Sequence, residues 1–305
     1  MTTTSAVREL PPPPQRPPVS RAAARSRRRP TSGRNRPTWF TYAVLVVAAL
    51  LAVFPLYWMF VVGSNDTSAV SRVPPTFVPG GNFVDNIGLV EAQTPFARSL
   101  LNSAIVSVAV AALQMFFCSL AGFAFAKLRF RGRGPLFVFV VSTMAIPSQL
   151  GIIPMYMIMS ELDWTNTYWA LVVPGAVSAF GVFWMRQVVI GTIPDEMVDA
   201  ARIDGCSTFR IYWAIVVPNI RGAAAVFGLF SAMTTWNDFL WPLVVLNSPE
   251  NFTSQVAIQQ LRTTYSIDYS IVMTASVLAT LPLLLLFVLA GKQLVAGIMD
   301  GAFKG

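Results

Sequence analysis

Residues 194–218 read PDEMVDAARIDGCSTFRIYWAIVVP and interrupt a chain that is apolar on both sides of them. The stretch carries six charged side chains, and a glycine stands at position 205. A segment this polar is not stable inside the hydrocarbon layer of a membrane, because its charged groups would lose their hydration. If the flanking segments span a membrane, residues 194–218 lie outside the bilayer and connect two spans.

The composition of the whole chain indicates a membrane protein. Of 305 residues, 54% are hydrophobic and only 12% are charged, whereas soluble domains contain about 25% charged residues. A spanning helix needs roughly 20 apolar residues. Five segments meet this length without a charge, and a sixth contains one charge, Asp238. The segments are 37–65, 99–126, 134–160, 164–185, 223–247 and 269–291. We therefore predict an all-α membrane protein with six transmembrane helices.

The distribution of basic residues predicts the orientation of these spans. All but three of the 22 Lys and Arg residues lie before the first span, between the second and third, between the fourth and fifth, or after the sixth. The exceptions are Arg72, Arg98 and Arg262. Because Lys and Arg are enriched in cytoplasmic loops, both termini and residues 194–218 are expected in the cytoplasm. These basic segments are expected to contact anionic lipid and not nucleic acid.

Several classes of activity are excluded by missing residues. The chain has no histidine, which excludes histidine-based catalysis and histidine-containing zinc sites. It has no G-x-x-x-x-G-K-[ST] phosphate loop, so that it does not bind ATP in that way. We therefore expect neither an enzyme, nor a catalytic residue, nor a metal site in this chain.

The first 36 residues differ in composition from the remainder. They are rich in Pro, Arg, Ser and Thr and contain almost no large apolar side chain, so that they cannot form a core. Residues 26–30, SRRRP, superficially match a twin-arginine export signal. The apolar run that follows is too long for a signal peptide, and it favours a cytoplasmic tail before a retained span. The predicted organisation is a disordered tail, 1–36, and a six-span domain, 37–305.

Residues 194–218 contain the start and stop signals of a short helix. Pro194 suits a first helical turn, and Asp195, Glu196 and Asp199 would lie near its positive end. Gly205 would end the helix in a left-handed conformation, which a Cβ atom disfavours. The sequence therefore predicts a short exposed helix and a sharp turn.

The faces of this short helix are also predictable. Met197, Ala200, Ala201 and Asp204 recur at helical spacing, and the alanines give their face little bulk. After the turn, Ser207 can cap a second, aromatic helix that returns to the membrane. Such a segment could insert into a cleft of another protein and transmit a rigid displacement. The alternative is an ordinary amphipathic helix at the membrane surface.

The spacing within this segment resembles a known motif. The segment contains Asp199-Ala200-Ala201, then Gly205 and, after nine further residues, Ile215-x-Val217-Pro218. This order and spacing are similar to the EAA loop of bacterial ABC-importer permeases. Asp-Gly-x-Ser at 204–207 resembles the carbohydrate branch of that family. Asp199 departs from the pattern, since the family usually has Glu there. The shorter side chain leaves the contact of this residue with an ATPase in doubt.

Two further segments carry the same resemblance, which covers roughly residues 38–305. Residues 236–242, WNDFLWP, resemble the W-N-[DE]-F-L-x-P stretch of the fifth span. Residues 297–305 resemble the C-terminal tail of maltose-permease-type subunits. In that family the tail can reach the ATPase dimer, which implies such a contact for Lys304. The chain is thereby identified as a maltose-permease-like, binding-protein-dependent importer permease of the carbohydrate family.

The resemblance implies the partners and the location of the chain. It implies a bacterial cytoplasmic membrane, a second, homologous permease subunit, two ABC ATPase subunits and an extracytoplasmic solute-binding protein. No cofactor is implied for this chain, because the partner ATPase binds ATP and magnesium. The cytoplasmic EAA-type coupling helix would lie between spans four and five. The residues implied to couple it to the ATPase are Glu196, Asp199, Ala200, Ala201, Asp204, Gly205 and Pro218.

Asp238 is the only acidic residue inside a predicted span. Pro242 removes the backbone hydrogen bond to its carbonyl, so that a kink is expected there. Two roles are open for the four residues Asp238, Asn237, Trp236 and Trp241. They face a substrate pathway, or they have structural roles. In the structural alternative, Asp238 and Asn237 cap the broken helix or contact another subunit, and the two tryptophans lie at the membrane interface. The third span is also expected to break, at Ile146-Pro147-Ser148-Gln149 and at Ile153-Pro154, and Gln149 is a weaker pathway candidate.

Two kinds of transported solute are considered, a neutral sugar and a different small polar solute such as glycerol phosphate. The spans contain no interior Lys or Arg, which favours a neutral sugar over glycerol phosphate or another small polar solute. A membrane scaffold without transport activity is a further alternative, and it predicts no associated ATPase.

Overall fold

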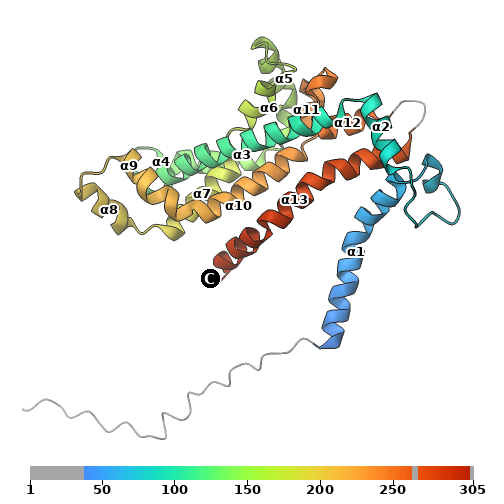
Figure 1. Ribbon diagram of the computed structural model, residues 1–305. Coiled ribbons are helices and arrows are strands. Elements are labelled where there is room, and N and C mark those ends of the chain that lie inside the picture. Colours follow the sequence, from blue (N-terminus) through green and yellow to red (C-terminus); the bar gives the residue numbers. More distant parts are fainter. Residues whose placement is uncertain (1–37, 263–266, 303–305) are drawn as a thin grey trace, which may run out of the picture. The chain divides into compact units, whose positions relative to one another are not determined.

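The computed structural model describes residues 38–262 and 267–302 (Figure 1). The regular secondary structure of these residues is helical, apart from an isolated β-bridge between Arg262 and Ile267, so that the all-α prediction is confirmed for the described part. The helices are α1 (Trp39–Gly63), α2 (Phe83–Gln93), α3 (Phe96–Lys127), α4 (Arg133–Ser142), α5 (Ile152–Glu161), α6 (Tyr168–Gly175), α7 (Ala179–Thr192), α8 (Asp195–Ile203), α9 (Thr208–Ile211), α10 (Val217–Trp236), α11 (Leu240–Val245), α12 (Ser254–Gln260) and α13 (Tyr269–Ala302). The predicted tail 1–36 and Lys304 lie outside the described residues.

The chain divides into two units, residues 1–53 and 54–305. In the first unit, the described residues from Trp39 onward belong to the first part of α1, and all of them are exposed. A helix that is apolar and exposed on every side suits a lipid environment. Both candidate sites lie in the second unit.

Among the described residues, four helices are long and apolar enough to cross a membrane. They are Trp39–Gly63, Phe96–Lys127, Thr208–Trp236 and Tyr269–Leu289. Two bent helix pairs satisfy the same criterion when each pair is taken as one span. The structure therefore contains four to six candidate spans, and the chain is a multi-pass membrane protein.

Proline residues account for the bends in the two helix pairs. The pair that contains α4 and α5 bends by 95°, and Ile146, before Pro147, is extended because the proline ring disfavours a helical conformation of the preceding residue. The pair α6 and α7 bends by 42° after Pro174. Ser178 then starts α7, since its hydroxyl oxygen accepts a hydrogen bond from the Gly181 N–H at 3.0 Å. The break predicted at residues 146–149 of the third span is thus confirmed, whereas the break predicted at Ile153-Pro154 is wrong, because Pro154 lies in the first turn of α5, where a proline is tolerated.

The predicted boundaries of the fifth span are wrong. The long helix begins at Thr208 and ends at Trp236, whereas the sequence suggested residues 223–247. Helical structure continues through Pro218 because the preceding turn, Tyr212–Val216, is a π-helix. Proline cannot donate to the carbonyl one turn earlier, and a π-turn accommodates this loss. Asp238 consequently lies in the break between α10 and α11 instead of inside a helix.

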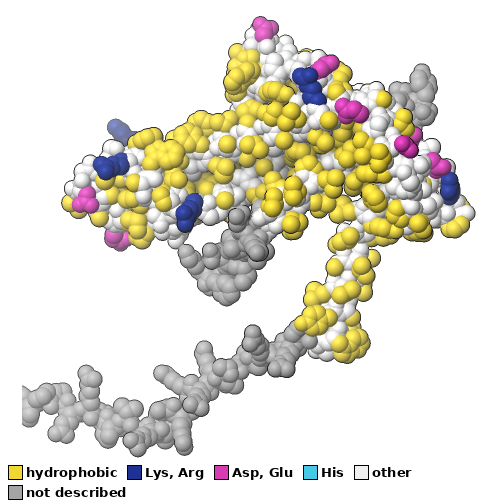
Figure 2. All heavy atoms as spheres, in the orientation of Figure 1, with side chains coloured by type: hydrophobic (Ala, Val, Ile, Leu, Met, Phe, Trp, Pro, Cys, Tyr) yellow, Lys and Arg dark blue, Asp and Glu magenta, His cyan; other side chains and the backbone are white. Residues whose placement is uncertain are grey.

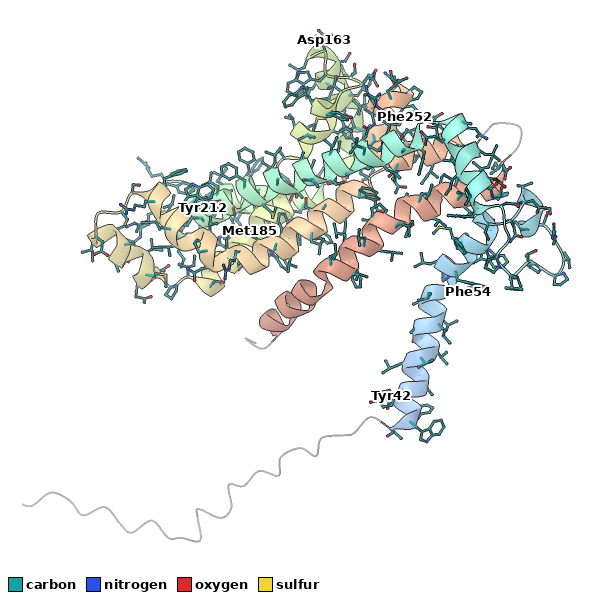
Figure 3. All side chains as sticks on the ribbon, in the orientation of Figure 1. Tyr42, Phe54, Asp163, Met185, Tyr212 and Phe252 are labelled. Carbon is teal, nitrogen blue, oxygen red and sulfur yellow. The ribbon has the colours of Figure 1, made fainter. Side chains whose placement is uncertain are left out.

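Two apolar clusters pack along α3. One cluster joins the first half of α3 to α6, α11, α12 and α13, with Phe96, Val110 and Val256 among its buried residues. The other joins the second half of α3 to α7, α8 and α10, with Met185 and Tyr212 buried in it. Figure 3 shows Met185 and Tyr212 near the α8–α9 end and Phe252 near α12. The two clusters position the two ends of the helix bundle.

A close approach of backbones fixes α3 against α7. A Cβ atom at Gly122 would lie 2.7 Å from the Arg186 backbone nitrogen, so that only glycine permits this packing. Hydrophobic side chains cover the surface over α3 and α10, and charged side chains gather toward the ends of the unit (Figure 2). This distribution agrees with helices that lie in lipid with their ends in water.

Candidate functional site

The short helix predicted after residue 194 is present as α8. Pro194 occupies its N-cap position, and Asp195 and Glu196 form the first turn at the positive end of the helix dipole. Gly205 has φ +77°, and its N–H donates to the Arg202 carbonyl at 3.0 Å. The Cys206 N–H donates to the Ala201 carbonyl at 2.9 Å, which completes a Schellman motif. The predicted left-handed stop is confirmed.

The two alanines of α8 do not share an environment. Ala201 is 7% exposed and packs with Val198 in the apolar cluster, whereas Ala200 is exposed. The inner face is therefore apolar and buried, and the expectation of one exposed face containing both alanines is wrong. The reason is the register of α8, since Val198 and Ala201 are three residues apart and face the protein together. The exposed residues of the predicted coupling set are Glu196, Asp199, Ala200, Asp204, Gly205 and Pro218.

The second helix of the segment starts as the sequence predicts. The Ser207 hydroxyl oxygen accepts a hydrogen bond from the Arg210 N–H at 3.3 Å, which caps α9. Beyond the π-turn, the Asn219 amide donates to the Ile215 carbonyl at 2.7 Å. The buried hydroxyl groups of Tyr212 and Ser119 are hydrogen-bonded at 2.7 Å. The bond between Tyr212 and Ser119 holds the return helix against α3, and the other two bonds stabilise the segment locally.

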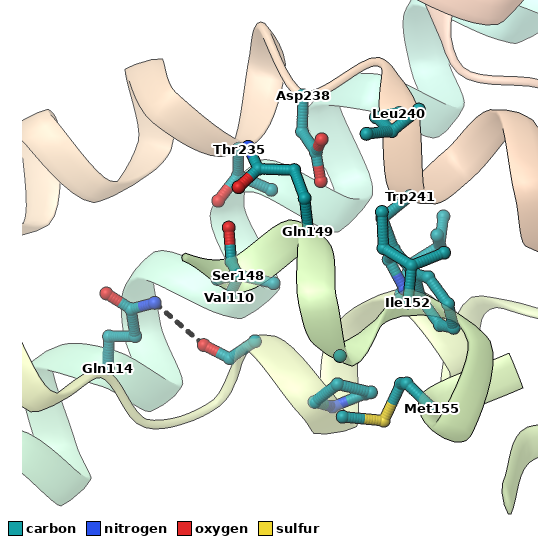
Figure 4. Close-up of a pocket in the computed structure, with 14 residues that line it drawn as sticks. Val110, Gln114, Ser148, Gln149, Ile152, Met155, Thr235, Asp238, Leu240 and Trp241 are labelled. Carbon is teal, nitrogen blue, oxygen red and sulfur yellow. Dashed lines mark hydrogen bonds between the residues drawn. The ribbon is translucent and has the colours of Figure 1, made fainter. Parts of the chain in front are cut away.

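A polar cavity of about 340 Å³ lies at the break between α10 and α11 (Figure 4). Three of the five predicted pathway residues line it: Gln149 from the bend of the third candidate span, Asp238 from the break and Trp241 from α11. The Trp241 indole N–H donates to the Ala170 carbonyl at 2.9 Å, which fixes the ring orientation. Residues distant in the sequence thus converge on one cavity.

The other two predicted residues are used elsewhere. Trp236 is buried, and its indole N–H donates to the Ala279 carbonyl at 3.2 Å, so that it connects α10 to α13. The Asn237 amide donates to the Met233 carbonyl at 2.8 Å and thereby caps the end of α10. Neither residue lines the cavity. The cap formed by Asn237 corresponds to the structural alternative, whereas Trp236 is buried between helices and does not lie in an interfacial belt.

Gln114 also lines the cavity, although it is not among the residues predicted from the sequence. Its amide nitrogen donates to the Gly175 carbonyl at 2.7 Å, and its amide oxygen accepts from the Ser231 hydroxyl at 2.9 Å. Gln114 therefore connects α3 to the ends of α6 and α10. A carboxamide in the middle of an uncharged span is the signal that could have identified it.

The lining of the cavity combines polar and apolar groups. Asp238 and Gln149 offer oxygen and amide groups for hydroxyl groups, and Leu171, Ile152 and Trp241 offer apolar surface. None of the described lining residues is Lys or Arg. Such a lining suits a neutral, hydroxyl-rich solute better than a phosphate.

Comparison with known proteins identifies the family. Residues 117–299 match the family described as binding-protein-dependent transport system inner membrane component. The chain is 35% identical over 269 residues to the lactose transport system permease protein of Rhizobium radiobacter, an alignment that covers 88% of this chain and 97% of the relative. It is 31% identical over 271 residues to an arabinooligosaccharides transport system permease protein of Halalkalibacterium halodurans, with the same coverage.

Two further matches extend this comparison. The sn-glycerol-3-phosphate transport system permease protein of Yersinia pestis is 30% identical over 269 residues, which cover 86% of this chain and 95% of the relative. A chain in the crystal structure of a bacterial ABC transporter involved in import of the acidic polysaccharide alginate has the same fold. Its TM-score is 0.72 at 22% identity, over 91% of this chain and 99% of that chain. This chain therefore belongs to the family of inner membrane permease components of binding-protein-dependent ABC importers.

Proposed function

We propose that the chain is a permease subunit that imports a neutral sugar or oligosaccharide and that α8 is its coupling helix. The observation that carries the proposal is the exposed, capped α8, held on the bundle by one apolar face. Its other face, with Glu196, Asp199, Ala200 and Asp204, is free to enter the cleft of an ATPase subunit. Sugar transport is supported by the relatives named for lactose and arabinooligosaccharides.

Six spans follow if each bent pair crosses the membrane once. The basic residues then place both termini and α8 in the cytoplasm. The organisation that we propose is a cytoplasmic tail, 1–36, and a permease domain, 37–305. The tail of the chain at Lys304 would lie on the same side as the ATPase subunits.

The mechanism that we propose is alternating access driven by partner subunits. Two ABC ATPase subunits bind ATP and magnesium and close, and α8 moves with them, because its outer face is seated in their cleft. This movement reaches α10 through residues 205–218, whose conformation depends on the turn at Gly205 and on Pro218. A second, homologous permease completes the pathway, and an extracytoplasmic binding protein delivers the sugar. This chain itself needs no cofactor and catalyses no reaction.

The cavity at Asp238 is the part of the pathway that we assign to this subunit. Asp238 and Gln149 would accept and donate hydrogen bonds to sugar hydroxyl groups, and Trp241 would pack against an apolar face of the ring. Trp236 and Asn237 support this cavity from outside. The second permease would line the remainder of the pathway.

Copurification followed by transport measurement tests the proposal. The tagged chain is isolated from its native membrane, its associated proteins are identified, and uptake is measured in proteoliposomes with lactose, arabinooligosaccharides and glycerol 3-phosphate. We expect an ABC ATPase, a second permease, and uptake of a neutral sugar that depends on ATP and on the binding protein. Isolation without an ATPase, as the scaffold alternative predicts, would contradict the proposal.

Glycerol phosphate is the second candidate substrate, because one relative is named for it. A phosphate would require cationic side chains in the pathway, and the described lining residues of the cavity include none. ATP-dependent uptake of glycerol 3-phosphate, without uptake of either sugar, would establish this alternative.

A further inference from the structure

The first residue of α8 forms an ion pair with the last residue of α3. The Lys127 Nζ donates to the Asp195 carboxylate. The lysine side chain is only 5% exposed, whereas the aspartate side chain is 79% exposed. An ammonium group removed from water is costly without a counter-charge, so that Lys127 needs a partner at this position.

The ion pair connects two helix ends of opposite polarity. Lys127 stands at the negative, C-terminal end of α3, and Asp195 stands at the positive, N-terminal end of α8. Each charge is thus favoured by the dipole of its own helix as well as by its partner. The ammonium group of Lys127 holds the pKa of the Asp195 carboxyl below its ordinary value.

The opposite end of α8 contacts the same residue. The Arg202 guanidinium donates to the Lys127 carbonyl at 3.4 Å and to the Asp199 carboxylate at 3.1 Å. Between these two contacts, Val198 and Ala201 are buried against the apolar cluster. Lys127 is therefore contacted from both the first and the last turn of α8.

Helix α3 leads from this contact to the polar cavity. Gln114 lies thirteen residues before Lys127 in the same unbroken helix, which corresponds to about 20 Å at 1.5 Å per residue. Gln114 lines the cavity and is hydrogen-bonded to the ends of α6 and α10. A displacement of Lys127 along the helix axis is thus carried directly to the cavity.

The chain itself leaves α8 in two directions, and both paths to the cavity contain a bend. On the N-terminal side, α7 ends at Thr192, just before α8, and leads back to the 42° bend between α6 and α7. On the C-terminal side, the chain passes through the left-handed turn at Gly205, the four-residue helix α9 and the π-turn Tyr212–Val216 before α10 begins. Bends and π-segments interrupt the regular hydrogen bonding of a helix. The noncovalent contact with α3 therefore adds a path to the cavity through one unbroken helix.

We propose that Lys127 and Asp195 form a latch that transmits the movement of the coupling helix to α3 and thereby to the polar cavity. Both are positioning residues, since neither contacts the transported solute in this arrangement. The inference rests on the proposed function of α8. It adds a defined mechanical connection and predicts that ATP hydrolysis and transport separate when the latch is broken.

The test measures how much sugar is transported per ATP hydrolysed. The complete importer is reconstituted in proteoliposomes with its binding protein, in wild-type form and with Asp195→Asn, which preserves the shape of the side chain. We expect the number of sugar molecules transported per ATP hydrolysed to fall about fivefold or more, because the coupling free energy between two linked sites typically corresponds to at least that factor. Asp195→Glu, which keeps the carboxylate at the positive end of α8, should retain most of the ratio.

A matched control removes an ion pair of the same type elsewhere. Asp66→Asn breaks the exposed pair with Arg72, whose atoms are 3.1 Å apart, and should leave the ratio unchanged. A wild-type ratio in Asp195→Asn, or an equal fall in Asp66→Asn or in Asp195→Glu, would each overturn the latch. Absence of stimulated ATP hydrolysis in the wild-type complex would instead contradict the proposed function.

Discussion

The coupling segment, residues 194–218, and the polar cavity are built in opposite ways. The coupling segment is continuous in the sequence, and its start, stop and second helix depend on contacts between residues at most five apart. The cavity collects residues from α3, α5, α6, α11 and the breaks beside them, which are scattered between Val110 and Trp241. A local pattern suffices for the first, and only the packing of several helices creates the second.

The difference also separates two kinds of polar residue. In the coupling segment, charged side chains lie outward and remain hydrated, so that single changes there alter docking more than folding. Around the cavity, polar side chains such as Gln114 and Trp241 hold neighbouring helices through hydrogen bonds to backbone carbonyls. Changes there affect packing and solute contact together, and the experiments must separate the two effects.

The largest effect is expected when the turn of the coupling segment is broken. Gly205→Pro cannot adopt φ +77° and loses the hydrogen bond to the Arg202 carbonyl, at a cost of about 3 kcal/mol or more. We expect sugar uptake and stimulated ATP hydrolysis to fall to background. Gly205→Asn is the control, because asparagine tolerates a left-handed conformation, and it should retain most of the activity. Equal loss in both variants would mean that the turn conformation is not the decisive property.

The two alanines allow a sharper test of the α8 faces. Ala200→Trp adds bulk to the exposed face, so that we expect a normal melting temperature but loss of the copurifying ATPase. Ala201→Trp inserts the same bulk into the buried face and should lower the stability by about 1–3 kcal/mol. Thermal unfolding and copurification are measured for both. If Ala200→Trp retains the ATPase and Ala201→Trp does not unfold earlier, the assignment of the two faces is wrong.

The smallest effect is expected at the cavity, which the second permease also lines. Asp238→Ala removes a charged hydrogen-bond acceptor that is worth about 1.5 kcal/mol, and should raise the KM for sugar uptake roughly tenfold. Asn237→Ala is the adjacent control, since Asn237 caps α10 outside the cavity, and its KM should stay close to that of the wild type. A larger increase for Asn237→Ala than for Asp238→Ala would reverse the roles of the two residues.

Predictions from the sequence were correct where a structural feature depends on residues that are neighbours in the sequence. The left-handed turn at Gly205, the cap at Ser207 and the break before Pro147 each follow from the conformational limits of one or two residues. The end of α10 was misplaced by eleven residues, from Asn247 to Trp236. Hydropathy does not distinguish one long helix from a shorter helix followed by a break, because both are equally apolar.

The sequence by itself determined the membrane character of the chain, the α8 segment and its turn, because hydrophobicity and backbone conformation are properties of neighbouring residues. The tertiary structure alone decided that Ala200 and Ala201 lie in different environments and that Trp236 supports α13 instead of lining the cavity. It also decided that Gln114 lines the cavity and that Lys127 meets Asp195. The Lys127–Asp195 contact joins residues 68 positions apart, and the bond between Gln114 and Ser231 joins residues 117 positions apart, so that helix packing rather than local preference brings them together.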